Sequence, residues 1–518
     1  MYSDGSGEMR IDIFGSILND NDIEIKRHLS GYLKEYLDTG DNYRLKNYLD
    51  SLDGFYRIIC RCGKYTLIIS DRIRSHNTLF HYENGWILDE ISVISPAIPD
   101  DQRTIFEASG FSLGISTLVN GLQQSVAGTI IVLDDSNTEI EVVSYQNFLV
   151  SGTGCDESVI ESSMRKSIEK MVKHFGDKNY LVPLSGGYDS RYILTLLIQA
   201  GVSSDKIQCF TYGVKSSYEA GISKKVANSL GVKWTFIEQS KEFWDEWVNS
   251  DDFNQYVRSS SQFSSCSVIQ DWPVIGKLLR DGIIDKSYVV VPGHAGDFVA
   301  GSHFIAPFLD SEVSYATVNE YLKRKHFALS ITSKRTNEMI EVELEKYLVA
   351  AKKLCPNLTP IAYFEWWDWR ERQSKLIFNS VRAYEYWGLQ WWCPFWSKDV
   401  FDSYQNIRFE NRISTKSYLN VVNKIYSQQI GTTLQDIGSE RVGFLNFIKA
   451  MVKEHFSFIY ESKYVVTAAR KKKYRDLKRT HPMAWNAIPA LTNTDDSKSL
   501  SFYNVFSKIT IEAISNDS

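Results

Sequence analysis

The sequence predicts an α/β protein with a mainly-β N-terminal part, a doubly wound parallel sheet in the middle and a helical C-terminal part. Three observations support this prediction. Short alternating segments separated by turn residues extend to about residue 150, strands alternate with helices from residue 178, and mainly helical patterns follow from about residue 304. We therefore expect three domains, at residues 1–150, 155–425 and 426–518.

The N-terminal part contains one early helix, expected at residues 22–36. Alternation of apolar and polar residues then predicts strands at residues 55–62, 65–70 and 128–144. Cys60 and Cys62 lie two apart in the first of these strands. We expect both as small apolar groups on one face, rather than as metal ligands or a disulfide.

Small and acidic residues at 152–158 interrupt this pattern, and a long helix to about residue 175 follows, so we place the domain boundary here. Beyond it, we expect strands at 180–183, 206–212, 233–238 and 287–291 and helices at 191–201, 218–230 and 272–280. This alternation is typical of a parallel sheet that binds ligands at the carboxyl ends of its strands.

The composition of the 518 residues is that of a globular protein, with 43% hydrophobic and 23% charged residues. Neither an apolar run long enough to cross a bilayer nor a secretion signal is apparent, so we expect a cytoplasmic protein. The seven cysteines are scattered without a C-x-x-C pair, and the nine histidines suggest no zinc site. A net charge of −5 gives no reason to expect nucleic acid as a partner.

The most informative segment is L-S-G-G-Y-D-S-R at residues 184–191, between an expected strand and an expected helix. Alone, Ser-Gly-Gly is an ordinary turn, but strand, loop and helix here have the order that a phosphate site requires. The glycines let backbone N–H groups approach a polyphosphate, and Asp189 can hold magnesium. The motif S-G-G-x-D-S resembles the pyrophosphate loop of the ATP pyrophosphatases, which implies ATP and Mg²⁺ as cofactors and adenylation as the chemistry.

A second loop, P-G-H-A-G-D-F-V-A-G at residues 292–301, follows the expected strand at 287–291. A carboxylate at the carboxyl end of a parallel strand is well placed to hold a metal ion. We therefore predict Asp297 as a second magnesium ligand opposite Asp189.

These two motifs together resemble the asparagine synthetase family. A third stretch, residues 387–399, is similar to that family's W-G-V-E-A-R-V-P-F-L-D-K pattern in its Trp-Gly, Pro-Phe and Lys. Lys416 stands where the family has a lysine that contacts the departing pyrophosphate, and Arg382 where it has a basic residue near the triphosphate, so the resemblance implies a catalytic role for both. It also implies that ATP and pyrophosphate are bound by Leu184, Ser185, Gly186, Gly187, Asp189, Ser190, Thr211, Gly293 and Lys375.

The N-terminal part resembles, in fragments at residues 15–19, 52–56 and 71–81, the family's glutamine amidotransferase domain of the Ntn type. That domain uses an N-terminal cysteine as its nucleophile. Here Met1 is followed by Tyr2, and the nearest cysteine is Cys60 in an expected strand. We expect a degenerate domain without glutaminase activity, so that the nitrogen comes from ammonia, a partner glutaminase or an amine.

The third motif departs from the family pattern at Gln390, Trp392 and Ser397, near its acceptor pocket. Aspartate is therefore a doubtful substrate, and the closest resemblance is to proteins of bacterial surface-polysaccharide pathways, which implies amidation of a uronic acid. The alternatives are a peptide or small-molecule cyclase of the lasso-peptide or β-lactam type, an enzyme that adenylates a nucleobase or tRNA, and a non-catalytic nucleotide-binding relative.

Two further patterns have both structural and functional interpretations. The aromatic clusters at 364–369 and 384–392 are expected in the core, with a sugar- or base-binding wall as the alternative. Arg372, Lys375 and Arg382 recur at helical spacings and are expected on one helix face. The basic run at 470–479 is expected as a solvated helix face, with contact to an anionic lipid or lipid-linked substrate at the inner face of the membrane as the alternative.

Overall fold

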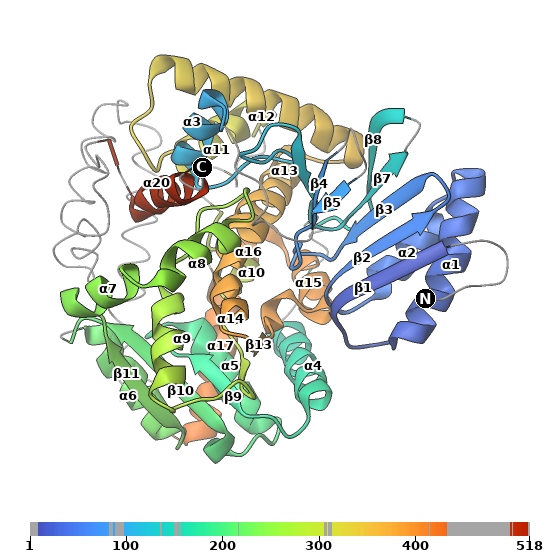
Figure 1. The fold of residues 1–518 in the computed structure, drawn as a ribbon. Helices are drawn as coiled ribbons and strands as arrows, with labels where there is room; N and C mark the ends of the chain where they lie inside the picture. The colour runs from blue at the N-terminus through green and yellow to red at the C-terminus, as the bar shows by residue number, and fades with distance from the viewer. Residues whose placement is uncertain are drawn as a thin grey trace.

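The computed structural model describes residues 9–81, 86–88, 98–134, 137–149, 154, 157–215, 217–304, 308, 313–413, 415–431, 498–499 and 501–515. Figure 1 shows an N-terminal sheet on one side of the molecule and a second sheet on the other, with helices of the later part of the chain between them. The basic run predicted at 470–479 lies outside the described residues.

The N-terminal sheet is antiparallel, with the strand order β1-β2-β3-β7-β8. Its strands are β1 (Met9–Ile17), β2 (Gly54–Cys62), β3 (Tyr65–Ser70), β7 (Thr129–Asp134) and β8 (Asn137–Ser144). The helices α1 (Asp22–Thr39) and α2 (Tyr43–Ser51) bury their apolar faces against it, with Ile25, Leu29 and Leu49 inaccessible to solvent. A smaller sheet, β5 (Trp86–Leu88), β4 (Leu79–His81) and β6 (Leu122–Gln124), and helix α3 (Asp100–Ser109) complete this part.

The segment at 128–144, where alternation predicted strand structure, contains two strands, β7 and β8, which pair antiparallel. Helices α2 and α3 were not expected from the sequence. Each is short, with nine and ten residues, and has too few turns for a clear apolar period.

The second sheet is entirely parallel and has the strand order β11-β10-β9-β12-β13. The strands are β9 (Tyr180–Pro183), β10 (Ile207–Gly213), β11 (Lys233–Glu238), β12 (Val289–Val290) and β13 (Gln390–Trp391). The chain leaves β9 toward β10 and β11 and then returns to place β12 on the other side of β9, which confirms the doubly wound prediction. The topological switch point therefore lies between β9 and β12, where such folds bind their ligands.

Helices connect and cover the parallel sheet, and most of the described chain beyond residue 304 is helical, as predicted. The helices are α4 (Glu157–Phe175), α5 (Tyr188–Gln199), α6 (Tyr218–Ser229), α7 (Lys241–Val248), α8 (Asp251–Ser261), α9 (Asp271–Arg280), α10 (Gly296–Ala300), α11 (Tyr315–His326), α12 (Lys334–Leu354), α13 (Pro360–Trp367), α14 (Arg382–Tyr386), α15 (Lys398–Gln405), α16 (Phe409–Ile413), α17 (Lys416–Ile430) and α20 (Phe502–Ser515). The last of these packs against α3 and α8, so the C-terminal helix lies against both earlier parts of the chain (Figure 1).

The prediction that Arg372, Lys375 and Arg382 share one helix face is wrong. Residues Asp368–Ile377 form a π-helix, and a 3₁₀ turn at Phe378–Val381 follows before α14 begins. Because neither helix has 3.6 residues per turn, spacings of three and seven do not stack side chains here.

The aromatic clusters are core, as predicted. The largest side chains with less than 2% exposure include Trp366, Trp367, Trp369, Trp392 and Trp396. Trp392 packs edge-on against Phe55 of the N-terminal sheet, with ring centroids 4.6 Å apart. These tryptophans therefore contribute apolar burial and not a stacking platform.

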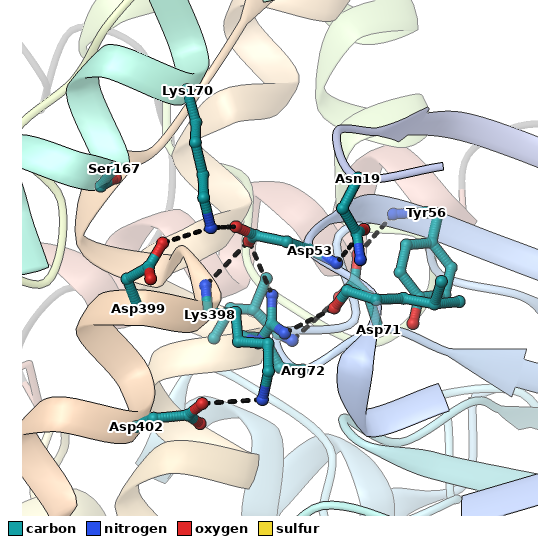
Figure 2. Close-up of polar contacts among 12 residues, drawn as sticks. Asn19, Asp53, Tyr56, Asp71, Arg72, Ser167, Lys170, Lys398, Asp399 and Asp402 are labelled. Carbon is teal, nitrogen blue, oxygen red and sulfur yellow. Dashed lines mark hydrogen bonds and ion pairs between the residues drawn. The ribbon is translucent and has the colours of Figure 1, made fainter. Parts of the chain in front are cut away.

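A network of charges joins the N-terminal part to the helices of the later part (Figure 2). The Asp53 carboxylate is 2% exposed and accepts hydrogen bonds from Lys170 Nζ at 3.1 Å and from the backbone N–H of Lys398 at 2.8 Å. Arg72 lies 3.5 Å from the same carboxylate. Because Ser397 makes no side-chain cap at the start of α15, Asp53 supplies that cap from the N-terminal part.

Candidate functional site

A cavity of about 230 Å³ opens at the switch point between β9 and β12. It is lined by Pro183, Ser185, Gly187, Asp189, Ser190, Tyr212, Asp271, Pro292, Gly293 and His294. The lining thus comes from the carboxyl ends of three parallel strands and the first residue of α9, as expected for a ligand site in this topology.

Two serine hydroxyl groups of the loop after β9 accept hydrogen bonds from the loop's own backbone N–H groups. Ser185 Oγ accepts a hydrogen bond from the Gly187 N–H at 3.1 Å, and Ser190 Oγ accepts one from the Ser185 N–H at 3.2 Å. Gly187 caps α5 without a side chain, and no side-chain cap occupies the first turn. The N–H groups at the start of α5 therefore remain available to an anion, with the positive end of the helix dipole behind them.

The loop after β12 lies directly against this first loop. A Cβ atom at Gly296 would come 2.2 Å from Asp189 Cγ, and one at Gly293 would come 3.1 Å from the Ser190 backbone nitrogen. Ala295, between them, has a left-handed backbone with φ of 72°. A glycine at 296 is therefore required for Asp189 to occupy its position.

Asp189 and Asp297, the two predicted magnesium ligands, are neighbours. Burial, followed by the negative charge of Asp297, raises the pKa of Asp189 to about 7. The backbone N–H of Asp297 and the hydroxyl of Tyr418 hydrogen-bond Asp189 and act in the opposite direction. Two adjacent carboxylates whose charges repel each other fit a hard divalent cation that takes its remaining ligands from water and phosphate.

Lys416 is the first residue of α17 and is exposed. It follows Thr415, which has a left-handed φ of 53°. Two residues later, the Tyr418 hydroxyl donates a hydrogen bond of 2.6 Å to Asp189 Oδ1. The start of α17 is thus joined to the Asp189 loop, although Lys416 does not line the cavity.

Thr211 and Leu184 are buried residues that pack beside the loop at 185–190 without facing the cavity. The Thr211 hydroxyl donates to the Leu184 carbonyl at 2.6 Å and accepts from Trp234 Nε1 at 2.9 Å. Both residues are buried, and neither lines the cavity. Their side chains therefore shape the loop and do not face a ligand there. Gly186 lies in the loop without lining the cavity.

Comparison of the sequence with protein-family models shows the family of this chain. The family model described as asparagine synthase matches residues 160–429, which is more than half of the chain. The chain belongs to the asparagine synthase family. It is therefore an ATP-dependent amide ligase of the adenylating kind, which forms carbon–nitrogen bonds.

A search of curated proteins finds no match to this chain. Among solved structures, a chain described as an NH3-dependent NAD synthetase from Campylobacter jejuni subsp. jejuni NCTC 11168, in complex with the nitrate ion, is similar at 16% identity and a TM-score of 0.23. The match covers 44% of this chain and 97% of that chain. No helix in the described part of this chain is both long and apolar enough to cross a bilayer.

Lys375, predicted from the family resemblance as an ATP ligand, has a different environment. Its side chain is fully buried, and its ammonium group donates to the carbonyls of Ser112 and Gly114 at 2.8 Å each and to Glu371 at 2.7 Å. Burial lowers the pKa of Lys375 to about 8. Because all three donors have acceptors inside the protein, the prediction for Lys375 is wrong.

Arg382 lies at the contact with the N-terminal part. Its guanidinium donates to the Ser75 carbonyl and pairs with Glu385, and the side chain is only 8% exposed. It does not line the cavity. Where the family resemblance implied a contact with triphosphate, the structure places an arginine that joins α14 to the loop after β3.

The three positions that depart from the family's third motif lie outside the cavity. Trp392 and Ser397 are each 1% exposed and lie in the core, and Gln390 is an exposed residue of β13. None of them lines the cavity. Trp392 fills space against Phe55, so this cavity does not owe its shape to these substitutions.

Four residues with polar side chains at the site were not predicted, namely Tyr212, Asp271, His294 and Tyr418. His294 could have been found, since it lies inside the second loop motif. The others come from the end of β10, the start of α9 and the first turn of α17, and only the folded chain brings them together.

Proposed function

We propose that this ligase activates a carboxylate as an acyl adenylate and then transfers it to ammonia or an amine. The observation that supports this proposal most strongly is the contact of two loops, each with an aspartate, beside an open helix N-terminus in a chain of this family. Residues 1–150, 155–425 and 426–518 would be the amidotransferase-like, adenylating and C-terminal parts.

In the first step a carboxylate oxygen of the substrate attacks the α-phosphorus of ATP. The bond from that phosphorus to the bridging oxygen of the β-phosphate breaks, and diphosphate leaves. We assign the binding of the diphosphate part to Ser185, Ser190 and the N–H groups at the start of α5. Lys416, at the start of α17, would compensate the charge that develops on the leaving group.

In the second step the nitrogen lone pair attacks the acyl carbon. The bond from that carbon to the AMP oxygen breaks, AMP leaves, and the nitrogen loses a proton. Asp189 and Asp297 would hold Mg²⁺, which when bound neutralises phosphate charge. Both carboxylates must then be ionised, so the proton on Asp189 has to leave.

We assign the nitrogen source to ammonia or an amine, with a partner glutaminase as one supplier. Burial in β2 raises the pKa of the Cys60 thiol to about 12, so this cysteine is not a nucleophile at neutral pH. A uronic acid of a surface polysaccharide is our proposed carboxylate, from the sequence resemblance alone. Peripheral contact with an anionic membrane through residues 470–479 is likewise a proposal from the sequence.

The test is exchange of labelled diphosphate into ATP in the presence of single carboxylates, because this exchange needs only the first step. The panel contains free and nucleotide-linked uronic acids, aspartate and short peptides. We expect exchange with one acid and none without acid, and AMP release with that acid only after an ammonium salt or an amine is added. AMP release with glutamine alone would contradict the proposed nitrogen source. Exchange with a peptide but with no uronic acid would favour the cyclase alternative.

A further inference from the structure

One wall of the cavity carries no assigned function. It presents the side chains of Tyr212, Asp271 and His294, which come from β10, the start of α9 and the loop after β12. Among the described residues, neither a lysine nor an arginine lines the cavity. A carboxylate without a lysine or arginine beside it suits a positively charged ligand rather than a carboxylate or a phosphate.

Asp271 is an 8% exposed carboxylate at the first position of α9. Its Oδ1 accepts a hydrogen bond from the Tyr212 hydroxyl, and its Oδ2 accepts one of 2.6 Å from Tyr384. Both donors are neutral, since burial followed by the Asp271 charge raises the pKa of each phenol well above its usual value. Within the described ranges, Asp271 forms no ion pair.

A buried carboxylate that accepts one hydrogen bond on each oxygen keeps further lone pairs free on both oxygens. Removing such a charge from water without a counter-ion costs free energy. Two buried carboxylates elsewhere in the described chain have cations, since Glu365 lies 2.5 Å from Arg412 and Glu371 pairs with Lys375. Asp271 differs from them in facing a cavity, so a cation from outside can complete its environment.

His294 adds a second polar group to the same wall. Its ring nitrogens lie 3.2 Å from the hydroxyl oxygen of Ser380, and burial lowers the pKa of the imidazole below its usual value. A neutral imidazole does not repel a cation and has one ring nitrogen that accepts a hydrogen bond. A cation at Asp271 would share the cavity with Ser185 and Ser190, beside the place proposed for the diphosphate part of ATP.

We propose that Asp271, with Tyr212 and His294, binds the nitrogen substrate in its protonated form, as an ammonium ion or a primary alkylammonium group. This inference rests on the proposed function, in which an amine attacks an acyl adenylate. This wall would hold the cation in the cavity, and the donors Tyr212 and Tyr384 would hold the carboxylate in place. Because the bound cation has no lone pair, one of its protons would pass to the neutral imidazole of His294 before the nitrogen attacks the acyl carbon.

The direct test needs no carboxylate substrate. Crystals of the full chain are soaked in thallium(I), an ammonium-sized cation with strong anomalous scattering, and then in thallium(I) with excess ammonium or excess methylammonium. We expect an anomalous peak in contact with Asp271 that is lost on competition. Loss with ammonium alone would select the free ion, and loss with both would extend the site to primary amines. A peak only at Asp189 and Asp297, or no peak, would overturn the proposal.

Kinetics provide the second measurement, with Asp271→Asn compared to Asp252→Asn. Asp252 is the matched control because its carboxylate also accepts a tyrosine hydroxyl, from Tyr386 at 2.9 Å, but it is exposed on α8. We expect Asp271→Asn to raise the KM for ammonium by about tenfold or more and to leave the KM for ATP and the diphosphate exchange unchanged. A raised KM for ATP instead would assign Asp271 to the nucleotide and overturn the proposal.

The two measurements separate the failure of this inference from the failure of the proposed function. Absence of diphosphate exchange with every acid would count against adenylation, while the thallium experiment would still decide the cation site. If Asp271→Asn does not fold, the wild-type soak with its two competitors is sufficient.

Discussion

The hydroxyl of Tyr418 donates a hydrogen bond of 2.6 Å to Oδ1 of Asp189. This contact joins α17 to the first turn of α5, although Tyr418 and Asp189 are more than two hundred positions apart in the chain. It also fixes the helix whose first residue is Lys416, so the proposed metal ligand and the proposed leaving-group cation are positioned by one hydrogen bond.

We predict that Tyr418→Phe weakens the binding of Mg²⁺–ATP by about tenfold, since a hydrogen bond to a charged group contributes roughly 1.5–3 kcal/mol. Titration of metal and nucleotide by calorimetry measures this. The matched control is Tyr426→Phe on the same helix, whose hydroxyl lies 2.8 Å from that of Ser229. Equal affinities in the two variants would show that the Tyr418 contact does not position the ligand.

Metal affinity should depend on pH through Asp189. The pKa of this carboxyl is raised to about 7, so it holds a proton below that pH and a cation must displace it. The apparent affinity for Mn²⁺ should rise by about tenfold per pH unit up to about pH 7 and then level off. Electron paramagnetic resonance of free Mn²⁺ measures this, and a flat profile between about pH 5 and pH 8 would contradict it.

The same pKa shift has a consequence for stability without metal. Because the folded state holds the proton more tightly than the unfolded chain, the contribution of Asp189 to stability is present below the ordinary pKa of 3.8 and is lost as the pH rises toward about 7. Saturating Mg²⁺ should offset this loss, so the rise in melting temperature caused by the metal should be larger at pH 8 than at pH 5. An equal rise at both values would contradict this interpretation.

Gly296→Ala should abolish the site, because the added Cβ would lie 2.2 Å from Asp189 Cγ and 2.4 Å from its Oδ1. We expect loss of metal binding and of diphosphate exchange, with the far-ultraviolet circular dichroism unchanged. Gly31→Ala in α1 is the control, since nothing lies within 4 Å of its Cβ and the change favours a helix. Wild-type exchange in Gly296→Ala would refute the requirement for close approach of the two loops.

Substitution of the two lysines predicted to act on phosphate should have different effects, on stability for Lys375 and on catalysis for Lys416. Lys375→Met leaves Glu371 buried without its cation and should lower the free energy of unfolding by about 3–5 kcal/mol, measured by denaturant titration. Lys416→Met changes an exposed residue and should leave that free energy almost unchanged while reducing the rate of diphosphate exchange. The reverse assignment of the two effects would show that Lys375 is the functional lysine.

Much of the parallel sheet was predictable, because apolar runs and amphipathic stretches alternate clearly around it. The loops at 184–191 and 292–301 carry their own signals, namely glycines beside aspartates at the ends of strands. Reasoning from the motif and the topology therefore sufficed to expect Asp189 and Asp297 near each other, and their role as metal ligands stays a prediction.

The remainder depended on contacts that periodicity does not encode. The π-helix at Asp368–Ile377 changes which faces carry Lys375 and Arg382. The segment 370–382 holds four basic residues, and a lysine among them looks the same in sequence whether it is buried or exposed. Tyr418 and Asp271 reach the site from helices distant in the chain. No local pattern marks either of them.

Exchange of labelled diphosphate into ATP, over a panel of carboxylates, with wild-type protein and Asp189→Asn, would decide whether this chain adenylates at the Asp189 loop. We expect exchange that requires one carboxylate and Mg²⁺, occurs without ammonium and disappears in the variant. Phosphate release in place of diphosphate, or exchange that persists in Asp189→Asn, would contradict adenylation at this site.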